Sequence, residues 1–262
     1  MALNVQDLAE GFHDAGIERG DHILVHSSLS SLGWVDGGAD AVIDALLACV
    51  GESGTVLFPT LTGCPDDSRE HPPVFDARHT RCWTGSVPET ARSREGAVRS
   101  LHPTHSLAAI GELAQWITAD HELVRSPCGF GSPYDKLADI AGKIALVGVS
   151  QAANTSFHHA EEVAGCPYVL LPDPVDLSLI DATGGQVRMR GTYLHRWGPK
   201  RDFETFELAM IDYGICRAGQ VGDAAVRVMD AMLLRMFLVR KLFEDPLATL
   251  ALEERARWIG RT

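Results

Sequence analysis

Apolar and polar residues alternate along the chain in blocks that predict helices followed by short buried strands. A helical repeat of apolar positions covers residues 5–15, and an uninterrupted apolar run follows at 23–25. The same order recurs, with helical spacing at 39–50 and a second apolar run at 54–58. Alternation of this kind predicts strand–helix–strand units over a mainly parallel sheet.

The remaining pattern extends this fold and adds an antiparallel element. Two runs at 175–180 and 186–193 flank a Gly-Gly turn and predict a hairpin, at an edge of the sheet or in a small second sheet. Residues 221–243 predict one long helix with apolar positions on more than one face. Further helices are expected at 87–94, 112–119 and 133–140, and further strands at 106–110 and 143–149. We therefore expect an α/β fold in one domain over residues 1–262, a mixed, mainly parallel β-sheet flanked by helices, with an antiparallel hairpin.

Composition and charge narrow the classes of function. The chain has 262 residues, of which 45% are hydrophobic and 22% charged, typical of a globular protein and not of a disordered or collagen-like one. Its formal net charge of −12 repels phosphate backbones and anionic lipid surfaces, so neither nucleic acid nor a membrane is an expected partner. A cationic small molecule fits this charge better.

The N-terminal residues and the cysteines indicate the cellular compartment. The first residues, MALNVQDLAEGF, lack the basic and apolar regions of a signal peptide, and no apolar run reaches the length of a membrane span. Six cysteines lie far apart with no CxxC pair, a spacing typical of reduced thiols. We expect a cytoplasmic protein without structural disulfides or a zinc ribbon.

The most informative candidate for chemistry is His158, in the segment NTSFHHAEE at 154–162. If a helix begins at Asn154 or Thr155, His158 lies in its first turn and Glu161 on the same face one turn later. The positive end of the helix dipole disfavours an imidazolium, and a carboxylate can fix the tautomer of the ring. A neutral histidine held in this way meets the requirement for a general base. The alternative is a solvated helix start, and for His159, which points to a different side of the helix, this alternative is favoured.

Two further segments follow predicted strands. The serine-rich loop at 26–33 comes after the strand at 23–25, where an open α/β sheet binds ligands, and its hydroxyls and backbone N–H groups could hold a phosphate or a pantetheine arm. It lacks a GxGxxG or P-loop pattern, so a plain loop is the alternative. His102 and His105 have the spacing of metal ligands, but Pro103 argues against a shared helix face. Cys128 lacks an adjacent partner that would make it a nucleophile.

These segments together resemble the aminoglycoside 3-N-acetyltransferase family over nearly the whole chain. Several motifs occur in order and at compatible spacing, which is more specific than any one of them. They are residues 24–29 with 32–33 and 37–38, 54–62, 99–106, 132–137 with 142–143, 154–161, and 219–222 with 245–246.

The resemblance implies transfer of an acetyl group from acetyl-CoA to the 3-amino group of an aminoglycoside, with no metal cofactor. On the matching positions the resemblance implies three catalytic residues: His158 is the base, Glu161 orients it, and Asp202 lies near the acceptor. The expected coenzyme-binding residues are Ser28, Leu29, Ser30, Ser31, Leu32, Gly33, Thr104, His105 and Ser106. Carboxylates on the long loop at 63–81 are candidates for acceptor contact, with solvated charge as the alternative; they are Asp66, Asp67, Glu70 and Asp76.

Three other hypotheses stay open at this point. The stretch at 63–81 and the segment after Glu162 match the family least, so an N-acyltransferase of the same fold with another amine or another acyl-CoA is the first. A metal-dependent hydrolase using His102, His105, His158 and Glu161 is the second. The third is a ligand-binding protein without catalysis. The sequence does not indicate the oligomeric state.

Overall fold

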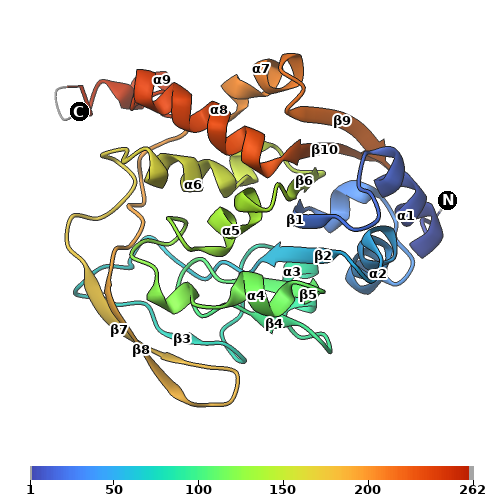
Figure 1. Ribbon diagram of the computed structural model, residues 1–262, viewed down its shortest axis with the longest axis horizontal. Helices are drawn as coiled ribbons and strands as arrows, with labels where there is room; N and C mark the ends of the chain where they lie inside the picture. Colours follow the sequence, from blue (N-terminus) through green and yellow to red (C-terminus); the bar gives the residue numbers. More distant parts are fainter. Residues whose placement is uncertain (1, 260–262) are drawn as a thin grey trace.

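The computed structural model describes residues 2–259 and centres on a seven-stranded sheet in the order β4-β5-β2-β1-β6-β10-β9 (Figure 1). Met1 and residues 260–262, which belong to the predicted domain, lie outside the described residues. The strands are β1 (His22–Ser27), β2 (Thr55–Pro59), β4 (Val98–Arg99), β5 (Leu107–Gly111), β6 (Lys143–Val147), β9 (Cys216–Val221) and β10 (Ala224–Asp230). Strand β1 pairs in parallel with β2 and β6, while the other ladders are antiparallel. The mixed sheet is confirmed, but the expectation that it is mainly parallel is wrong, because only the two ladders of β1 are parallel and the other four are antiparallel.

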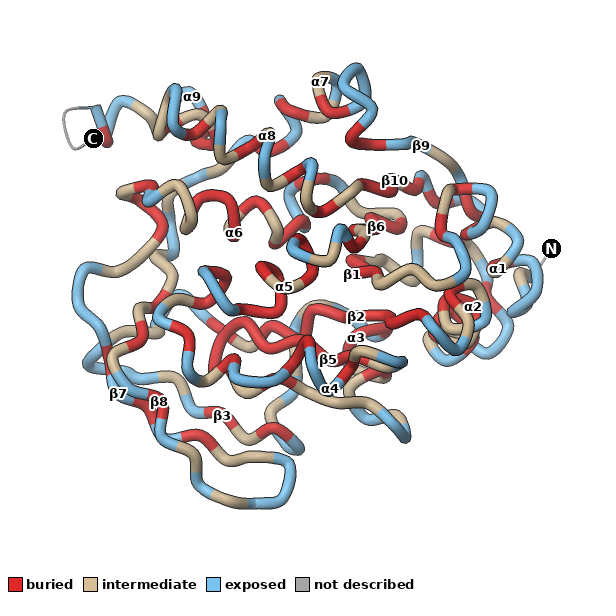
Figure 2. The backbone as a smooth tube through the Cα atoms, viewed as in Figure 1, coloured by how far each residue is buried: buried red, intermediate tan, exposed pale blue. Residues whose placement is uncertain are grey.

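Helices cover both faces of this sheet because alternate residues of the central strands point to opposite sides. Ile23 and Val25 of β1 pack into one apolar core with helices α1, α2 and α3, whereas Leu24 packs into a second core with α4, α5, α6 and α8. Figure 2 shows the central strands buried between these two layers. The helices are α1 (Val5–Asp14), α2 (Gly38–Val50), α3 (Ser86–Ala91), α4 (Ala114–Thr118), α5 (Pro133–Asp139), α6 (Ser156–Val163), α7 (Glu207–Asp212), α8 (Ala231–Glu244) and α9 (Leu252–Arg255).

The expected hairpin is confirmed and belongs to a small second sheet. Strands β7 (Val175–Ile180) and β8 (Gln186–Thr192) pair antiparallel, and β3 (Phe75–Asp76) joins β7 in parallel. Buried and exposed residues alternate along β7, so one face of the hairpin covers a third apolar cluster. The segment that leaves β8 then returns to the main body of the fold (Figure 1).

The prediction of one helix over 221–243 is wrong in its first ten residues. Residues 224–230 form β10, which inserts between β6 and β9, and helix α8 begins only at Ala231. Gly222, with φ of 56°, and Asp223 make the two-residue turn that joins β9 to β10. Asp230 then caps α8 by accepting a hydrogen bond from the backbone N–H of Leu233. The strand and the helix are both rich in apolar residues and follow one another directly, so we assigned the whole stretch to one helix.

The parallel centre of the sheet determines where a site can form. Strands β1 and β6 are in register up to Ser27 and Val147, so the loops that follow them leave the sheet at the same edge. The first loop contains the short 3-10 turn Leu29–Leu32, and the second leads through Gln151–Ala153 into α6. Within residues 2–259, no helix combines the length and apolar character needed to cross a membrane.

Candidate active site

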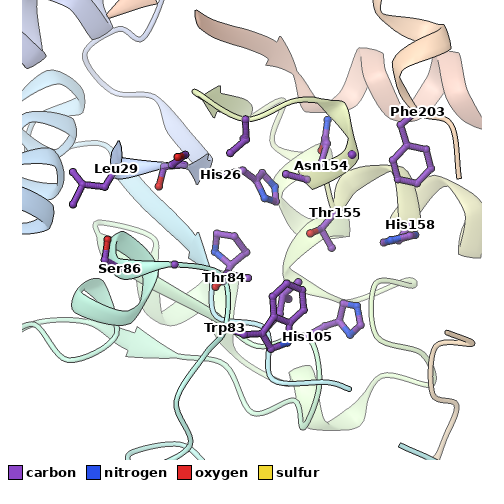
Figure 3. A pocket seen from close by; sticks show the side chains of 18 of the residues that line it. His26, Leu29, Trp83, Thr84, Ser86, His105, Asn154, Thr155, His158 and Phe203 are labelled. Carbon is purple, nitrogen blue, oxygen red and sulfur yellow. The ribbon is translucent and has the colours of Figure 1, made fainter. Parts of the chain in front are cut away.

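A cavity of about 1290 Å³ opens at this edge of the sheet. Its walls come from the loops after β1, β2 and β6, from the start of α3, and from residues 195–204 beyond the hairpin. Figure 3 shows side chains from these separate segments converging around it. The volume exceeds that of a usual drug-sized pocket, so two ligands can occupy it together.

His158 lies on this cavity in the first turn of α6, where the sequence predicts it (Figure 3). Its Nδ1 lies 2.8 Å from Oε2 of Glu161, one turn further along the helix. The Glu161 side chain is completely buried, while that of His158 keeps 26% of its surface exposed. The ring of Phe203 packs edge-on against the imidazole at 5.4 Å between centroids. The pair is therefore a built dyad, not a solvated helix start.

The surroundings of Glu161 keep it ionised. Thr249 donates a hydrogen bond to Oε1 at 2.5 Å, and Nε of Arg201 lies 3.5 Å from the same oxygen. Burial raises the pKa of the Glu161 carboxyl, but the hydrogen bond from His158 and the charge of Arg201 outweigh it and lower the pKa to about 2. A carboxylate at Nδ1 retains the ring proton there and leaves Nε2 of His158 as the nitrogen that can accept one.

Two further histidines line the cavity beside the dyad, His195 and His105. The sequence analysis did not identify His195 as a site residue. The rings of His158 and His195 lie 5.1 Å apart, and those of His195 and His105 lie 4.3 Å apart. Burial lowers the pKa of both His105 and His195 well below the usual value, so both rings are neutral at pH 7. His195 follows the hairpin, and no spacing in the sequence relates it to His158.

Most of the predicted coenzyme-binding residues line the cavity. Those that do are Ser28, Leu29, Ser30, Gly33, Thr104 and His105. The other three lie behind it. Ser31 bonds through its hydroxyl to Ser28 and to the carbonyl of Gly148, Leu32 is buried in the apolar core, and Ser106 bonds to Thr60. Asn154, Thr155 and Thr84 add polar groups that the sequence analysis did not assign to the cavity wall.

The acidic lining differs from the one expected. Asp202 faces the cavity as predicted, together with Glu204 and Asp36, which were missed. The four loop carboxylates, Asp66, Asp67, Glu70 and Asp76, are not among the lining residues. Two of them stabilise local turns instead: Asp67 accepts the backbone N–H of Cys64, and Asp76 pairs with His79. The long loop folds on itself and does not present these charges to the cavity.

The four residues of the hydrolase hypothesis do not form a common metal site. Nδ1 of His102 accepts backbone N–H groups from Thr104 and His105, which holds the turn before β5, and His102 does not line the cavity. Within residues 2–259, the group close enough to share an ion consists of His105, Cys128 and His195. The expectation of a solvated His159 is wrong, since this residue is buried and its Nδ1 bonds to the carbonyl oxygen of Cys128.

Comparisons of the sequence and of the fold with known proteins identify the same family. A family model described as aminoglycoside 3-N-acetyltransferase matches residues 24–242. Aminoglycoside N(3)-acetyltransferase VII of Streptomyces paromomycinus is 34% identical over 253 residues, covering 86% of each chain. The crystal structure of AAC(3)-Xa superposes with a TM-score of 0.79 at 30% identity and covers 93% of both chains.

Two similar structures carry ligands. AAC-IIIb in a binary complex with CoASH has a TM-score of 0.76 and 28% identity, covering 93% of this chain and 97% of its own. A His-to-Ala mutant of AAC(3)-IVa in complex with a gentamicin has a TM-score of 0.82 and 26% identity, covering 98% and 94%. The fold and the dyad thus define an acyltransferase of the antibiotic N-acetyltransferase type. The chain belongs to the aminoglycoside 3-N-acetyltransferase family, as its motifs indicate.

Proposed function

We propose that this protein transfers the acetyl group of acetyl-CoA to the 3-amino group of an aminoglycoside, with His158 as the general base. The observation that carries the proposal is the His158–Glu161 dyad, with its 2.8 Å contact, on the wall of a cavity large enough for donor and acceptor. Relatives of the same fold were solved with CoASH, a gentamicin and sisomicin, which supports both ligand classes.

The donor side of the cavity suits a thioester with a pantetheine arm. Ser28, Ser30 and Thr104 offer hydroxyl groups there, and Leu29 offers an apolar surface. Hydroxyls and backbone N–H groups that point into a partly enclosed site stabilise the negative charge that develops on a thioester oxygen during attack. We assign these residues to coenzyme binding on this basis.

The acceptor side suits a cationic amine. Asp202 and Glu204 line the cavity next to the dyad segment and attract ammonium groups. An ammonium group must lose a proton before it can attack, and Nε2 of His158 accepts that proton. The imidazolium that forms is stabilised by the Glu161 carboxylate at Nδ1.

The transfer then proceeds by ordinary acyl chemistry. The amine nitrogen bonds to the thioester carbon, and the carbon–sulfur bond breaks as the tetrahedral adduct collapses. The nitrogen releases its second proton to solvent, and the departing thiolate takes up the proton that His158 holds, so the dyad returns to its starting state. Holding the two reactants side by side in one cavity lowers the entropic part of the barrier.

The cellular setting follows from the same chemistry. We propose that residues 1–262 act as one domain in the cytoplasm, because acetyl-CoA is an intracellular metabolite and the six cysteines are all unpaired. Its partners on this proposal are two small molecules.

The experiment that tests the function is a thiol-release assay with acetyl-CoA and a panel of amines. Gentamicin and sisomicin are the first acceptors, and simple diamines and amino sugars serve as comparison substrates. NMR of the product locates the new amide, which we expect on the 3-amino nitrogen. Turnover of another amine with none of any aminoglycoside, or acetylation at another nitrogen, would contradict the proposal.

A further inference from the structure

Three soft or borderline ligands from separate parts of the chain meet beside the dyad. His105 precedes β5, Cys128 precedes α5, and His195 follows the hairpin. Their potential ligand atoms all lie within 4.8 Å of one another. His105 and His195 line the cavity, so an ion can reach them from solvent, whereas the Cys128 side chain lies buried behind them.

Both histidines are held in the way that metal-binding histidines are held. Nδ1 of His105 bonds to the Thr104 hydroxyl at 2.9 Å, and Nε2 of His195 bonds to Oε1 of Glu162 at 2.5 Å. Each ring therefore keeps its second nitrogen for a ligand: Nε2 in His105 and Nδ1 in His195. Metal-binding histidines characteristically make such a bond through the ring nitrogen that does not touch the metal, which fixes the ring.

Glu162 holds two of the three candidate ligands in place. Its Oε1 bonds to Nε2 of His195 and also accepts the backbone N–H of Cys128 at 2.9 Å. Burial raises the pKa of this carboxyl group to about 7, while a hydrogen bond from Ser126 opposes the rise. The Cys128 thiolate therefore supplies the negative charge that partly balances a divalent cation and lowers the cost of burying it.

The donor set selects the class of ion. Two imidazole nitrogens and one thiolate favour Zn²⁺ and its chemical neighbours over Mg²⁺ or Ca²⁺, which prefer oxygen ligands. Bond lengths of about 2.0–2.3 Å in a tetrahedral site place ligand atoms roughly 3.3–3.6 Å apart. The three side chains therefore need to approach by about 1 Å, within reach of small side-chain rotations.

We propose that His105, Cys128 and His195 form a binding site for a soft divalent transition-metal cation, represented by Zn²⁺, and that its occupation inhibits acetyl transfer. On binding, the Cys128 thiol loses its proton to solvent and its sulfur bonds to the ion. The inhibition rests on the proposed function: His105, His195 and His158 line the same cavity and the rings of His195 and His158 lie 5.1 Å apart, so a bound cation repels the cationic amine that must approach the base. The ion takes no part in the transfer reaction.

Cobalt binding tests the site without any enzyme assay. Dialysed full-length protein is titrated with Co²⁺, and we expect a thiolate-to-cobalt charge-transfer band that saturates at one ion per chain and is abolished by Zn²⁺. Cys128→Ala should lose this band and weaken Zn²⁺ binding by at least about tenfold. Cys216→Ala, which removes a buried cysteine in β9, is the matched control and should keep both.

Inhibition is measured separately as thiol release against Zn²⁺ concentration. The unmodified protein and Cys216→Ala should lose activity as the site fills, while Cys128→Ala should stay active at the same concentrations. Absence of the cobalt band in the unmodified protein would overturn the site, even if Cys128→Ala failed to fold. Binding without inhibition would overturn the regulatory part, and stoichiometric binding in a protein that acetylates no amine would refute the proposed function alone.

Discussion

Replacing Glu161 by glutamine separates the charge of the dyad from its packing. The amide has nearly the same volume as the carboxyl group, so the buried position one turn from His158 stays filled. What changes is the partner of Nδ1 at 2.8 Å: a carboxylate that can only accept a hydrogen bond becomes an amide that can also donate one.

The expected loss follows from the strength of a charge-assisted hydrogen bond. A hydrogen bond to a charged group is worth about 1.5–3 kcal/mol, so losing it from the imidazolium lowers kcat about 10- to 150-fold. If the amide donates to Nδ1, the proton moves to Nε2 and the base is blocked, which adds to this loss. KM for the acceptor should change little, because Glu161 is completely buried and does not line the cavity.

The assay is steady-state thiol release with gentamicin at saturating acetyl-CoA. Thr249→Val is the matched control, because it removes the hydrogen bond to the other carboxylate oxygen but leaves the charge in place. We expect a smaller decrease in kcat for this variant. A Glu161→Gln protein that is folded by circular dichroism and retains more than about half of the unmodified kcat would refute the assignment of Glu161.

Two further predictions concern the cavity and the buried histidines. Asp202→Asn should raise KM for the aminoglycoside about two- to fivefold with little change in kcat, as expected for a charge pair that is screened by solvent. Glu70→Gln, which lies away from the cavity, should leave KM unchanged. Equal effects of the two substitutions on KM would contradict the acidic lining of the cavity. Burial lowers the pKa of His26 and His121 in the folded protein to about 3, whereas the pKa of histidine in the unfolded chain is near 6.5. The neutral forms therefore contribute their full stability above pH 6.5, and this contribution is lost as the pH falls from 6.5 towards 3. The loss is about 1.4 kcal/mol per histidine one pH unit below 6.5, and urea unfolding at pH 7.5 and 5.5 measures it; equal free energies of unfolding would contradict the prediction.

The α/β fold could be predicted because its periodic signals are local. A helix such as α2 and a strand such as β2 each show their own spacing of apolar residues, and the hairpin carries a Gly-Gly turn between two runs. The boundary at Asp230 could not be found in the same way, because β10 and α8 are both apolar and adjoin without a loop. Only the pairing of β10 with β6 and β9, a long-range interaction, distinguishes strand from helix there.

In the site, too, local contacts could be predicted from the sequence and long-range contacts could not. His158 and Glu161 share one helical turn, so their contact is visible in the spacing alone. His195, Thr249 and Arg201 reach the dyad from distant segments, and a single sequence holds no signal for that approach. The loop carboxylates show the opposite case, since their local charge suggested a ligand role while the folded loop uses two of them in its own turns.

If His158 is the base that activates the amine, its removal slows the acyl-transfer step itself, which a single-turnover measurement separates from product release. Enzyme in excess over acetyl-CoA is mixed with saturating gentamicin, and thiol formation is followed in His158→Ala and in His13→Ala, which removes an exposed histidine at the end of α1. We expect a rate at least about 100-fold lower for His158→Ala and an unchanged rate for His13→Ala. A folded His158→Ala protein that forms thiol within about tenfold of the unmodified rate would contradict this expectation.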